Sequence, residues 1–379
     1  MRRPNRPARI RPGAWLGIWL AATIAAGAAA RGDGSAAGIA VGSAVVPVSQ
    51  GLKLRAGDRE ISPTPGAVLK VEQIQAGRLL VALPDGQSRG WVDADRVVPV
   101  DRALEHFDRA IAENSRDAWL LATRAALRVR RHDYAEAIDD YDLAIAIDPK
   151  ESAYYLGRGG LWARRGDHAR TIADLSTAIR LAPDQIDGYL LRAMEWEKDL
   201  KPDQALADYQ AAIAVEPRAT AAYVGRGRIW KMTGDFVRML GNYEELAQVA
   251  PEDPVGHREV AWLLASCDLD GFRDGRRALA EATVACKLTR WSDPSCLEAI
   301  AAACAEIGDF ENAVRWQTRA IELFSARLDR VDRRLAVNKG RDARMSNGLY
   351  RYRRHLPMRE RPDRTTRVVE IPAAAGPRG

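Results

Sequence analysis

Small, aromatic and proline residues recur at intervals of 34 positions from residue 101 into the last third of the chain. Three series show the interval most clearly: Pro149, Pro183, Pro217 and Pro251; Ala110, Ala144, Ala178 and Ala212; Phe107, Tyr141, Leu175, Tyr209 and Tyr243. The apolar residues within each interval follow helical spacing. A helical pattern that repeats in this way predicts a stack of similar helical units, each packed on its neighbours.

The residue types at these positions fit pairs of antiparallel helices. Small residues let two helices approach closely, and they recur as Ala125, Gly159, Ala193 and Gly227 on the first helix of each pair, with Ala137 and Ala205 on the second. Aromatic residues fill the space between turns. Proline ends the second helix because it cannot continue the hydrogen-bond ladder.

This combination of residues and spacing resembles the tetratricopeptide-repeat family over about residues 101–325. The resemblance implies a lone helix at 101–114, followed by repeats at 117–150, 151–184, 185–218, 219–252, 253–293 and 294–325. The fifth repeat is lengthened by an insertion around Cys267–Gly275. The last helix is expected to run past Arg334 as a cap.

Residues 45–100 follow a different pattern, in which short apolar and polar runs alternate with period two, as in Leu79 and Val81. Such alternation predicts strands with one buried face. A set of strands this small must hide its edges, most simply by closing on itself. Gly90-Trp91-Val92, followed by Val97-Val98, resembles the end of a bacterial Src-homology-3-like barrel.

We therefore predict a mainly α protein, in which a small all-β barrel at 45–100 precedes a tetratricopeptide-repeat superhelix, an α-α solenoid, at 101–337. Residues 31–44 are rich in Gly, Ala and Ser and predict a flexible linker. Residues 338–379 carry Gly, Pro and many Arg and predict a disordered basic tail.

Residues 1–30 resemble an export signal. Five arginines precede an apolar core at Ala14–Ala26, and small residues follow as far as Ala30. The alternative is an uncleaved membrane anchor. In both cases the flanking positive charge predicts that the rest of the chain lies outside the cytoplasm, in the periplasm or envelope of a bacterium. Membrane contact is expected only through 1–30, and only if that segment is retained.

The net charge of +6 comes from the two ends of the chain. Residues 327–367 hold 14 basic and five acidic residues, whereas residues 32–326 hold 36 basic and 45 acidic residues. A nucleic-acid-binding fold carries its positive charge on the folded body. We therefore expect no nucleic-acid partner.

Few residues suggest catalysis or metal binding. The five histidines, His106, His132, His168, His257 and His355, have no metal-ligand spacing with one another or with cysteine. No phosphate-binding glycine motif and no nucleophile elbow is present. We assign no catalytic residue, no cofactor and no metal, and we predict that the protein is not an enzyme.

All four cysteines, Cys267, Cys286, Cys296 and Cys304, lie in the last third of the chain. Disulfides persist in exported proteins, and Cys267 and Cys286 could meet across a helix hairpin. Four cysteines allow three pairings, which sequence does not distinguish. The alternative is that all four are small core residues.

Charged residues follow the 34-residue period as well. Arginines recur on the first helices, and Asp or Asn on the second: Arg124, Arg158, Arg192 and Arg226; Asp140, Asp174, Asp208 and Asn242. The favoured interpretation is an internal network of ion pairs that sets the register of the helices, because both series adjoin packing positions. The alternative is an arginine row that faces the groove and binds an acidic ligand.

The family resemblance implies a concave groove lined by first helices. Its expected lining is Trp119, Ala122, Ala126, Leu156, Gly160, Leu190, Met194, Val224 and Arg228. This mixture suits an extended peptide or a partner helix with some acidic character, so we predict a protein–protein interaction scaffold. The alternative is binding of cell-wall or other glycan polymer through the barrel, with the repeats as a spacer.

Overall fold

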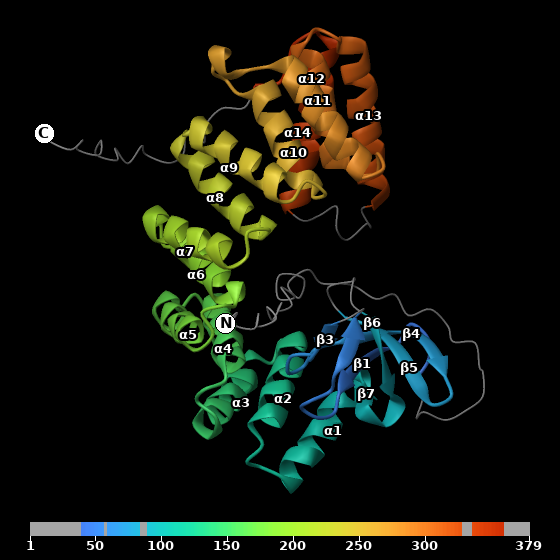
Figure 1. Cartoon of the computed structure of the whole chain (residues 1–379), viewed down its shortest axis with the longest axis vertical. Coiled ribbons are helices and arrows are strands. Elements are labelled where there is room, and N and C mark those ends of the chain that lie inside the picture. Colours follow the sequence, from blue (N-terminus) through green and yellow to red (C-terminus); the bar gives the residue numbers. More distant parts are fainter. Residues whose placement is uncertain (1–38, 57–58, 84–88, 328–335, 360–379) are drawn as a thin grey trace, which may run out of the picture. The chain divides into compact units, whose positions relative to one another are not determined.

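The computed structural model describes residues 39–56, 59–83, 89–327 and 336–359 (Figure 1). The predicted leader at 1–30 lies outside the described residues. The chain divides into an N-terminal unit, Met1–Leu200, and a C-terminal unit, Lys201–Gly379, and each is described by itself. Among the described helices, none is both long and apolar enough to cross a membrane.

The N-terminal unit begins with a small antiparallel β-domain. Its strands are β1 (Ala44–Pro47), β2 (Leu54–Ala56), β3 (Arg59–Ile61), β4 (Leu69–Gln75), β5 (Arg78–Ala82), β6 (Arg89–Asp93) and β7 (Val97–Pro99). Five strands form one sheet in the order β6-β5-β4-β1-β7, and β2 and β3 form a hairpin. Period-two alternation buries one side chain in two, so that Val71, Leu79 and Val81 lie in the core of this domain.

The prediction of a closed barrel is corrected by this topology. In the described residues β6 and β7 are the two edges of an open sheet. The sheet instead covers part of its surface by packing on the first helices, α1 (Val100–Glu113) and α2 (Ala118–Arg130): Val46 and Val98 belong to the same apolar cluster as the α2 residue Trp119. Docking onto helices protects a small sheet without closure.

Helices α1 and α2 begin a series of antiparallel helices that completes the N-terminal unit. The others are α3 (Tyr134–Ile147), α4 (Ser152–Arg165), α5 (His168–Leu181) and α6 (Ile186–Lys198). Helices α2 and α3 pack as one pair and α4 and α5 as the next. Asp117 caps α2 by accepting hydrogen bonds from the backbone N–H groups of Trp119 and Leu120. Gly166 ends α4 at a φ of 73°, a conformation that favours glycine.

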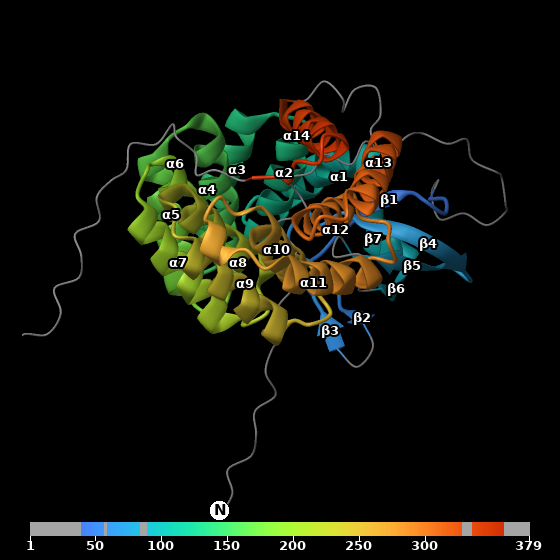
Figure 2. The same ribbon diagram turned by 90° about the horizontal axis from the view of Figure 1, so that it is seen from above.

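The C-terminal unit is helical throughout its described residues. Its elements are α7 (Pro202–Val215), α8 (Thr220–Thr233), α9 (Phe236–Val249), α10 (Pro254–Ser266), the 3₁₀-helix η2 (Asp270–Phe272), α11 (Gly275–Leu288), α12 (Pro294–Glu306), α13 (Phe310–Arg327) and α14 (Ala336–Arg353). The predicted insertion in the fifth repeat contains η2. Helices α10, α11 and α12 pack against one another (Figure 2).

Close approach between helices explains two glycines of the repeat pattern. Gly157 lies against the ring of Tyr141, where an added Cβ would overlap the aromatic carbons. Gly225 lies in the same way against Tyr209, in the C-terminal unit. Each ring is the bulky member of the 34-residue series and packs on the following first helix, so only glycine leaves room for it.

The C-terminal helix corrects the prediction of disorder over 338–379, as far as residue 359. Helix α14 packs against α13 and α12. Met345, Gly348 and Tyr352 are buried, and their spacing places them on one face of the helix. The segment is strongly polar, and few of its described positions are buried, so composition indicated disorder. Burial against the preceding repeat orders it instead.

We predict that Tyr352→Ala lowers the free energy of unfolding by about 3 kcal/mol, because it leaves a cavity in the core of the C-terminal unit. Tyr350→Ala, two residues earlier, should have little effect because Tyr350 is 57% exposed. Chemical denaturation followed by circular dichroism measures both. Equal effects of the two substitutions would mean that α14 is not docked.

Candidate functional site

The arginine series forms clamps between helices rather than a row of free cations. Arg124 on α2 donates two hydrogen bonds to Asp140 on α3, at 3.0 and 2.7 Å, and one to Asp108 on α1, at 2.9 Å. Asp140 is 1% exposed and also accepts a hydrogen bond from Arg128. The hydrogen bonds to Asp140 raise the pKa of the Arg124 guanidinium, and the one to Asp108 raises it further.

The same clamp recurs one period later. Arg158 on α4 binds Asp174 on α5 at 2.9 and 2.7 Å, and it reaches back to Asp142 on α3 at 2.5 Å. Its pKa is raised by the hydrogen bonds to Asp174 and then to Asp142. Each arginine therefore joins its own helix pair to the helix that precedes that pair.

Later members of the series keep this geometry with other acceptors. Arg192 on α6 donates to the Ser176 hydroxyl at 2.8 Å. In the C-terminal unit, Arg226 on α8 donates to Asn242 at 2.6 Å and to Gln210. Asp208 on α7 is buried. Arg226 also pairs with the Glu245 carboxylate at 2.7 Å, so these guanidiniums bind neighbouring helices of their own unit.

The predicted groove positions of the N-terminal unit are largely covered. Trp119 and Ala122 on α2 are buried in the cluster to which β1 contributes. Ala126, on the same helix, lies against Gly66 of the β-domain so closely that a Cβ on Gly66 would overlap it. The chain's own β-domain therefore occupies the part of the expected groove nearest to it.

Farther along the N-terminal unit, the expected lining is mixed. Leu156 on α4 is buried with Leu175 in a small core cluster, and Leu190 on α6 is 2% exposed. Gly160 is half-buried, and Met194 is 38% exposed. Of these positions, Met194 alone presents a substantial side chain to solvent, so the two leucines are core residues rather than ligand contacts.

The C-terminal unit exposes more of the same positions. Val224 on α8 is half-buried, and Arg228 is exposed with a hydrogen bond of 3.2 Å to the Tyr209 hydroxyl. Arg228 follows Met194 by 34 residues, and a further 34 residues lead to Trp262 on α10. The guanidinium of Arg344 on α14 lies 5.4 Å from the centre of that ring. Sequence reasoning missed Trp262, although extending the period by one step would have found it.

A buried carboxylate anchors Arg344 beside this tryptophan. Glu298 on α12 is 2% exposed and accepts a hydrogen bond from Arg344 at 3.1 Å, while Arg341 lies 3.7 Å away. Burial raises the pKa of Glu298, and the charges of Arg344 and Arg341 oppose that shift. The C-terminal helix therefore supplies positive charge to the surface formed by first helices.

The cysteines do not form the bridge between Cys267 and Cys286. All four are buried, and none of them forms a disulfide. Cys267 follows the end of α10, whereas Cys286 lies 11 residues after the start of the antiparallel α11. Those residues separate the two cysteines by about 16 Å along the hairpin, beyond the reach of a disulfide. Burial raises the pKa of Cys286 and Cys296 to about 12 and keeps these thiols neutral.

Two histidines make contacts that occupy them without forming a metal site. His168 Nδ1 binds the buried Glu195, and His257 Nδ1 lies 2.6 Å from Glu281. In the part of the chain that the structure describes, no group of three or more His, Cys, Asp or Glu residues is arranged to hold a metal ion.

Residues 123–186 and 197–254 match the family model described as tetratricopeptide repeat, so the helical array contains tetratricopeptide repeats. A search of curated proteins found none that matches the chain.

Several solved structures are similar in part. MamA shares 16% identity, covering 40% of this chain and 90% of its own, with a TM-score of 0.38. YrrB, a tetratricopeptide-repeat protein with an unusual peptide-binding site, shares 20%, covering 49% and 94%, with a TM-score of 0.38. A tetratricopeptide-repeat protein from Parabacteroides merdae shares 16%, covering 66% and 91%, with a TM-score of 0.43.

We predict that Arg158→Ala lowers the free energy of unfolding by about 3 kcal/mol, because it leaves the buried Asp174 carboxylate without its main partner. Arg109→Ala removes an exposed pair with Glu105 and should cost less than about 1 kcal/mol. Thermal and chemical denaturation compare the two variants. A negligible effect of Arg158→Ala would contradict a structural role for the clamp.

Proposed function

We propose that this tetratricopeptide-repeat array is a protein–protein interaction scaffold and that the C-terminal unit binds a peptide or helix with acidic residues. The proposed contacts lie on α8, α10 and α14. The observation that supports the proposal most directly is the combination of the exposed Arg228 with Trp262 and Arg344 on these helices. The family-model match supports the general role, since stacked repeats of this type present extended binding surfaces.

The chemistry of these residues favours an anionic ligand with apolar side chains. Arg228 offers a planar guanidinium that can bind a carboxylate through two parallel hydrogen bonds. The Arg344 side chain is 47% exposed although it binds Glu298, so part of it remains accessible. Trp262 is half-buried and adds an aromatic surface, and Val224 an aliphatic one. Tryptophan and arginine are the residue types enriched at the energetic centres of protein interfaces.

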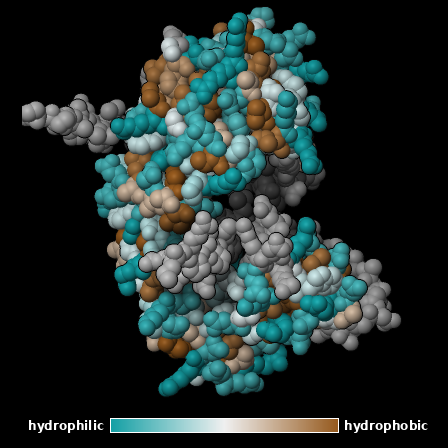
Figure 3. Space-filling view, viewed as in Figure 1, coloured by the Kyte–Doolittle hydropathy of each residue, from teal (hydrophilic) through white to brown (hydrophobic). Residues whose placement is uncertain are grey.

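On the face shown in Figure 3, apolar residues are scattered among hydrophilic ones. A ligand that meets such a surface gains little from apolar burial alone and depends on charge complementarity for specificity. Residues 32–326 hold more acidic than basic residues, so most of their surface repels an acidic partner. Exposed arginines at one place attract such a partner there.

Arg228→Glu should reduce capture of partner proteins from envelope extract about tenfold, because it places a like charge opposite the ligand's carboxylates. Arg180→Glu is the matched control, since Arg180 is an exposed arginine on the outer helix α5. Crosslinked pull-down followed by quantitative mass spectrometry compares both variants with the parent, after circular dichroism has shown equal helicity. Capture that falls equally in both variants, or in neither, would exclude this surface as the binding site.

One of the expected groove residues, Leu190, is unsuitable for such an experiment. Leu190 lies in the core, so a charged substitution there would test folding rather than binding. Arg228 tests binding because its side chain is exposed. Binding of glycan polymer through the β-domain stays a prediction, and cosedimentation of the chain with purified wall material tests it.

We propose that the scaffold lies outside the cytoplasm, because residues 1–30 resemble an arginine-rich, apolar export signal. An alkaline phosphatase fused after residue 50 should be active in bacterial cells, because that enzyme needs disulfides that form outside the cytoplasm. Replacing the apolar residues of the leader with charged ones should abolish the activity. An inactive fusion with the intact leader would contradict export.

A further inference from the structure

The sixth repeat replaces the arginine clamp by two stacked tryptophans. Trp316 on α13 follows the packing residue Ala313 by three positions, as Asp140 on α3 follows Ala137. In place of an arginine partner it has Trp291, which lies in the turn between α11 and α12. The two ring centres are 4.8 Å apart, with 23° between their planes. The last repeat therefore has aromatic surface where earlier repeats have buried charge.

The turn that carries Trp291 adopts a conformation that its residues do not favour. Arg290 and Trp291 have positive φ values of 49° and 57°. Elsewhere glycine adopts this conformation at the end of a helix, as Gly166 does after α4 and Gly234 after α8. Residues with side chains in this region are strained, and such strain is found most often where the side chain has a task. Here the strained turn directs an indole, 37% exposed, onto Trp316.

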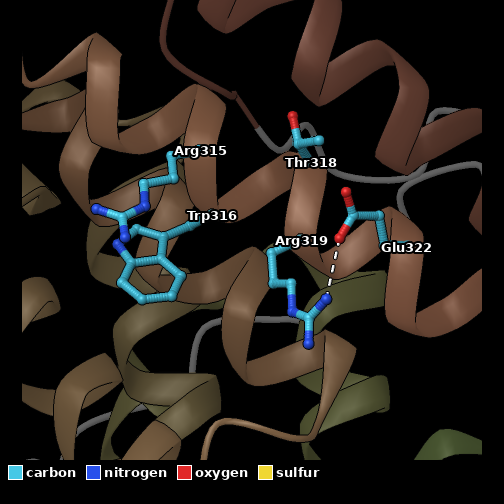
Figure 4. Close-up of a pocket in the computed structure, with 5 residues that line it drawn as sticks. All are labelled: Arg315, Trp316, Thr318, Arg319 and Glu322. Carbon is cyan, nitrogen blue, oxygen red and sulfur yellow. Dashed lines mark hydrogen bonds and ion pairs between the residues drawn. The ribbon is translucent and has the colours of Figure 1, made fainter.

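A cavity of about 440 Å³, lined by residues of α13 that include Trp316, adjoins this stack (Figure 4). It is lined by Arg315, Trp316, Thr318, Arg319 and Glu322. The guanidinium of Arg315 lies 5.7 Å from the centre of the Trp316 ring. Because the ring also stacks on Trp291, little of its face remains for a sugar. The cavity therefore offers positive charge and aromatic edge rather than a stacking platform.

An apolar stripe on α11 leads to the same place. Val284, Leu288 and Trp291 follow one another at intervals of four and three residues, and they are 38%, 39% and 37% exposed. This spacing places the two aliphatic residues on one face of the helix, in line with the tryptophan that follows its end.

We propose that these residues form a second docking site, which takes an acidic, leucine-rich segment of a partner protein. We call it the tryptophan–arginine surface, and it consists of Val284, Leu288, Trp291, Arg315, Trp316 and Arg319. It lies on the second helices α11 and α13, whereas Arg228 and Trp262 lie on the first helices α8 and α10. The inference therefore goes beyond the proposed function: one unit would hold two partners.

Charge complementarity identifies the class of ligand. Arg290 and Arg315 are exposed, and the guanidinium of Arg315 lies against the Trp316 ring. Arg319 pairs with Glu322 at 3.0 Å, and both side chains are more than half exposed. An exposed ion pair of this kind contributes little to stability, so a carboxylate of the ligand can replace Glu322 as the partner of Arg319. The chain's own residues 360–379 carry four arginines and three acids and do not supply such a ligand.

The test uses the purified full chain and a fluorescein-labelled synthetic peptide of repeating Glu-Glu-Leu-Leu units, with a Gln-Gln-Leu-Leu peptide as the neutral comparison. Fluorescence anisotropy measures the dissociation constant. We expect Trp291→Gly and Arg315→Glu each to weaken binding of the acidic peptide about tenfold or more, and the neutral peptide to bind about tenfold more weakly than the acidic one.

Two features of the variants separate binding from folding. Glycine accepts the positive φ of position 291, so Trp291→Gly should retain the fold while it removes the indole. If it unfolds, Arg315→Glu carries the test, since Arg315 is exposed. Arg276→Glu is the control: Arg276 is an exposed arginine at the start of α11, about 18 Å from the end of that helix.

The result that overturns the proposal is acidic-peptide binding that Arg315→Glu and a folded Trp291→Gly leave unchanged, or equal binding of the neutral peptide. Loss of binding in Arg228→Glu alone would assign the peptide to the inner helices instead, and so support the proposed function while excluding the second site. The remaining possible occupant is a second copy of this chain. Analytical ultracentrifugation of the parent chain and Trp291→Gly tests for it. A dimer that the substitution dissolves would show that a second copy fills the surface.

Discussion

Each helix pair of the array depends on contact with the next pair, because a single pair cannot bury both of its apolar faces. The clamp centred on Arg124 shows how that contact is specified. Its guanidinium binds Asp140 in its own pair and Asp108 in the preceding helix, so a shift in register would separate a nearly buried carboxylate from its partners. Apolar contacts supply most of the stabilisation, while the charged contacts select one register among several that would bury similar area.

The apolar faces at the two ends of the described array are covered by different elements. At the N-terminal end, the β-domain packs on α1 and α2, and Gly66 fits against Ala126. At the C-terminal end, α14 covers the last repeat, with Tyr352 in the core and Arg344 bound to the buried Glu298. Terminal repeats need such covers because their outward faces would otherwise be exposed. Both covers also reduce or alter the surface that remains available to a ligand.

Binding surfaces arise where the repeat pattern relaxes. The position held by Ala126 and Gly160 in early repeats becomes Arg228 and Trp262 in later ones. The position held by Asp140 becomes Trp316. Because the scaffold keeps its packing glycines and alanines, these changes alter the chemistry of the surface without altering the backbone that carries it. This separation allows a repeat protein to acquire new partners by substitution at exposed positions.

The sequence by itself determined the repeat, its period and the pairing of Arg124 with Asp140 and of Arg158 with Asp174, because these features follow from local helix geometry and from contacts between adjacent helices. Only the tertiary structure decided which expected groove residues are accessible. Trp119 and Ala122 are covered by strands that lie outside the repeats and do not share their sequence pattern. The docking of α14 depends on three buried residues in a polar segment. The stack of Trp291 on Trp316 depends on a turn with two positive φ values. Such contacts join distant segments, and no periodic pattern encodes them.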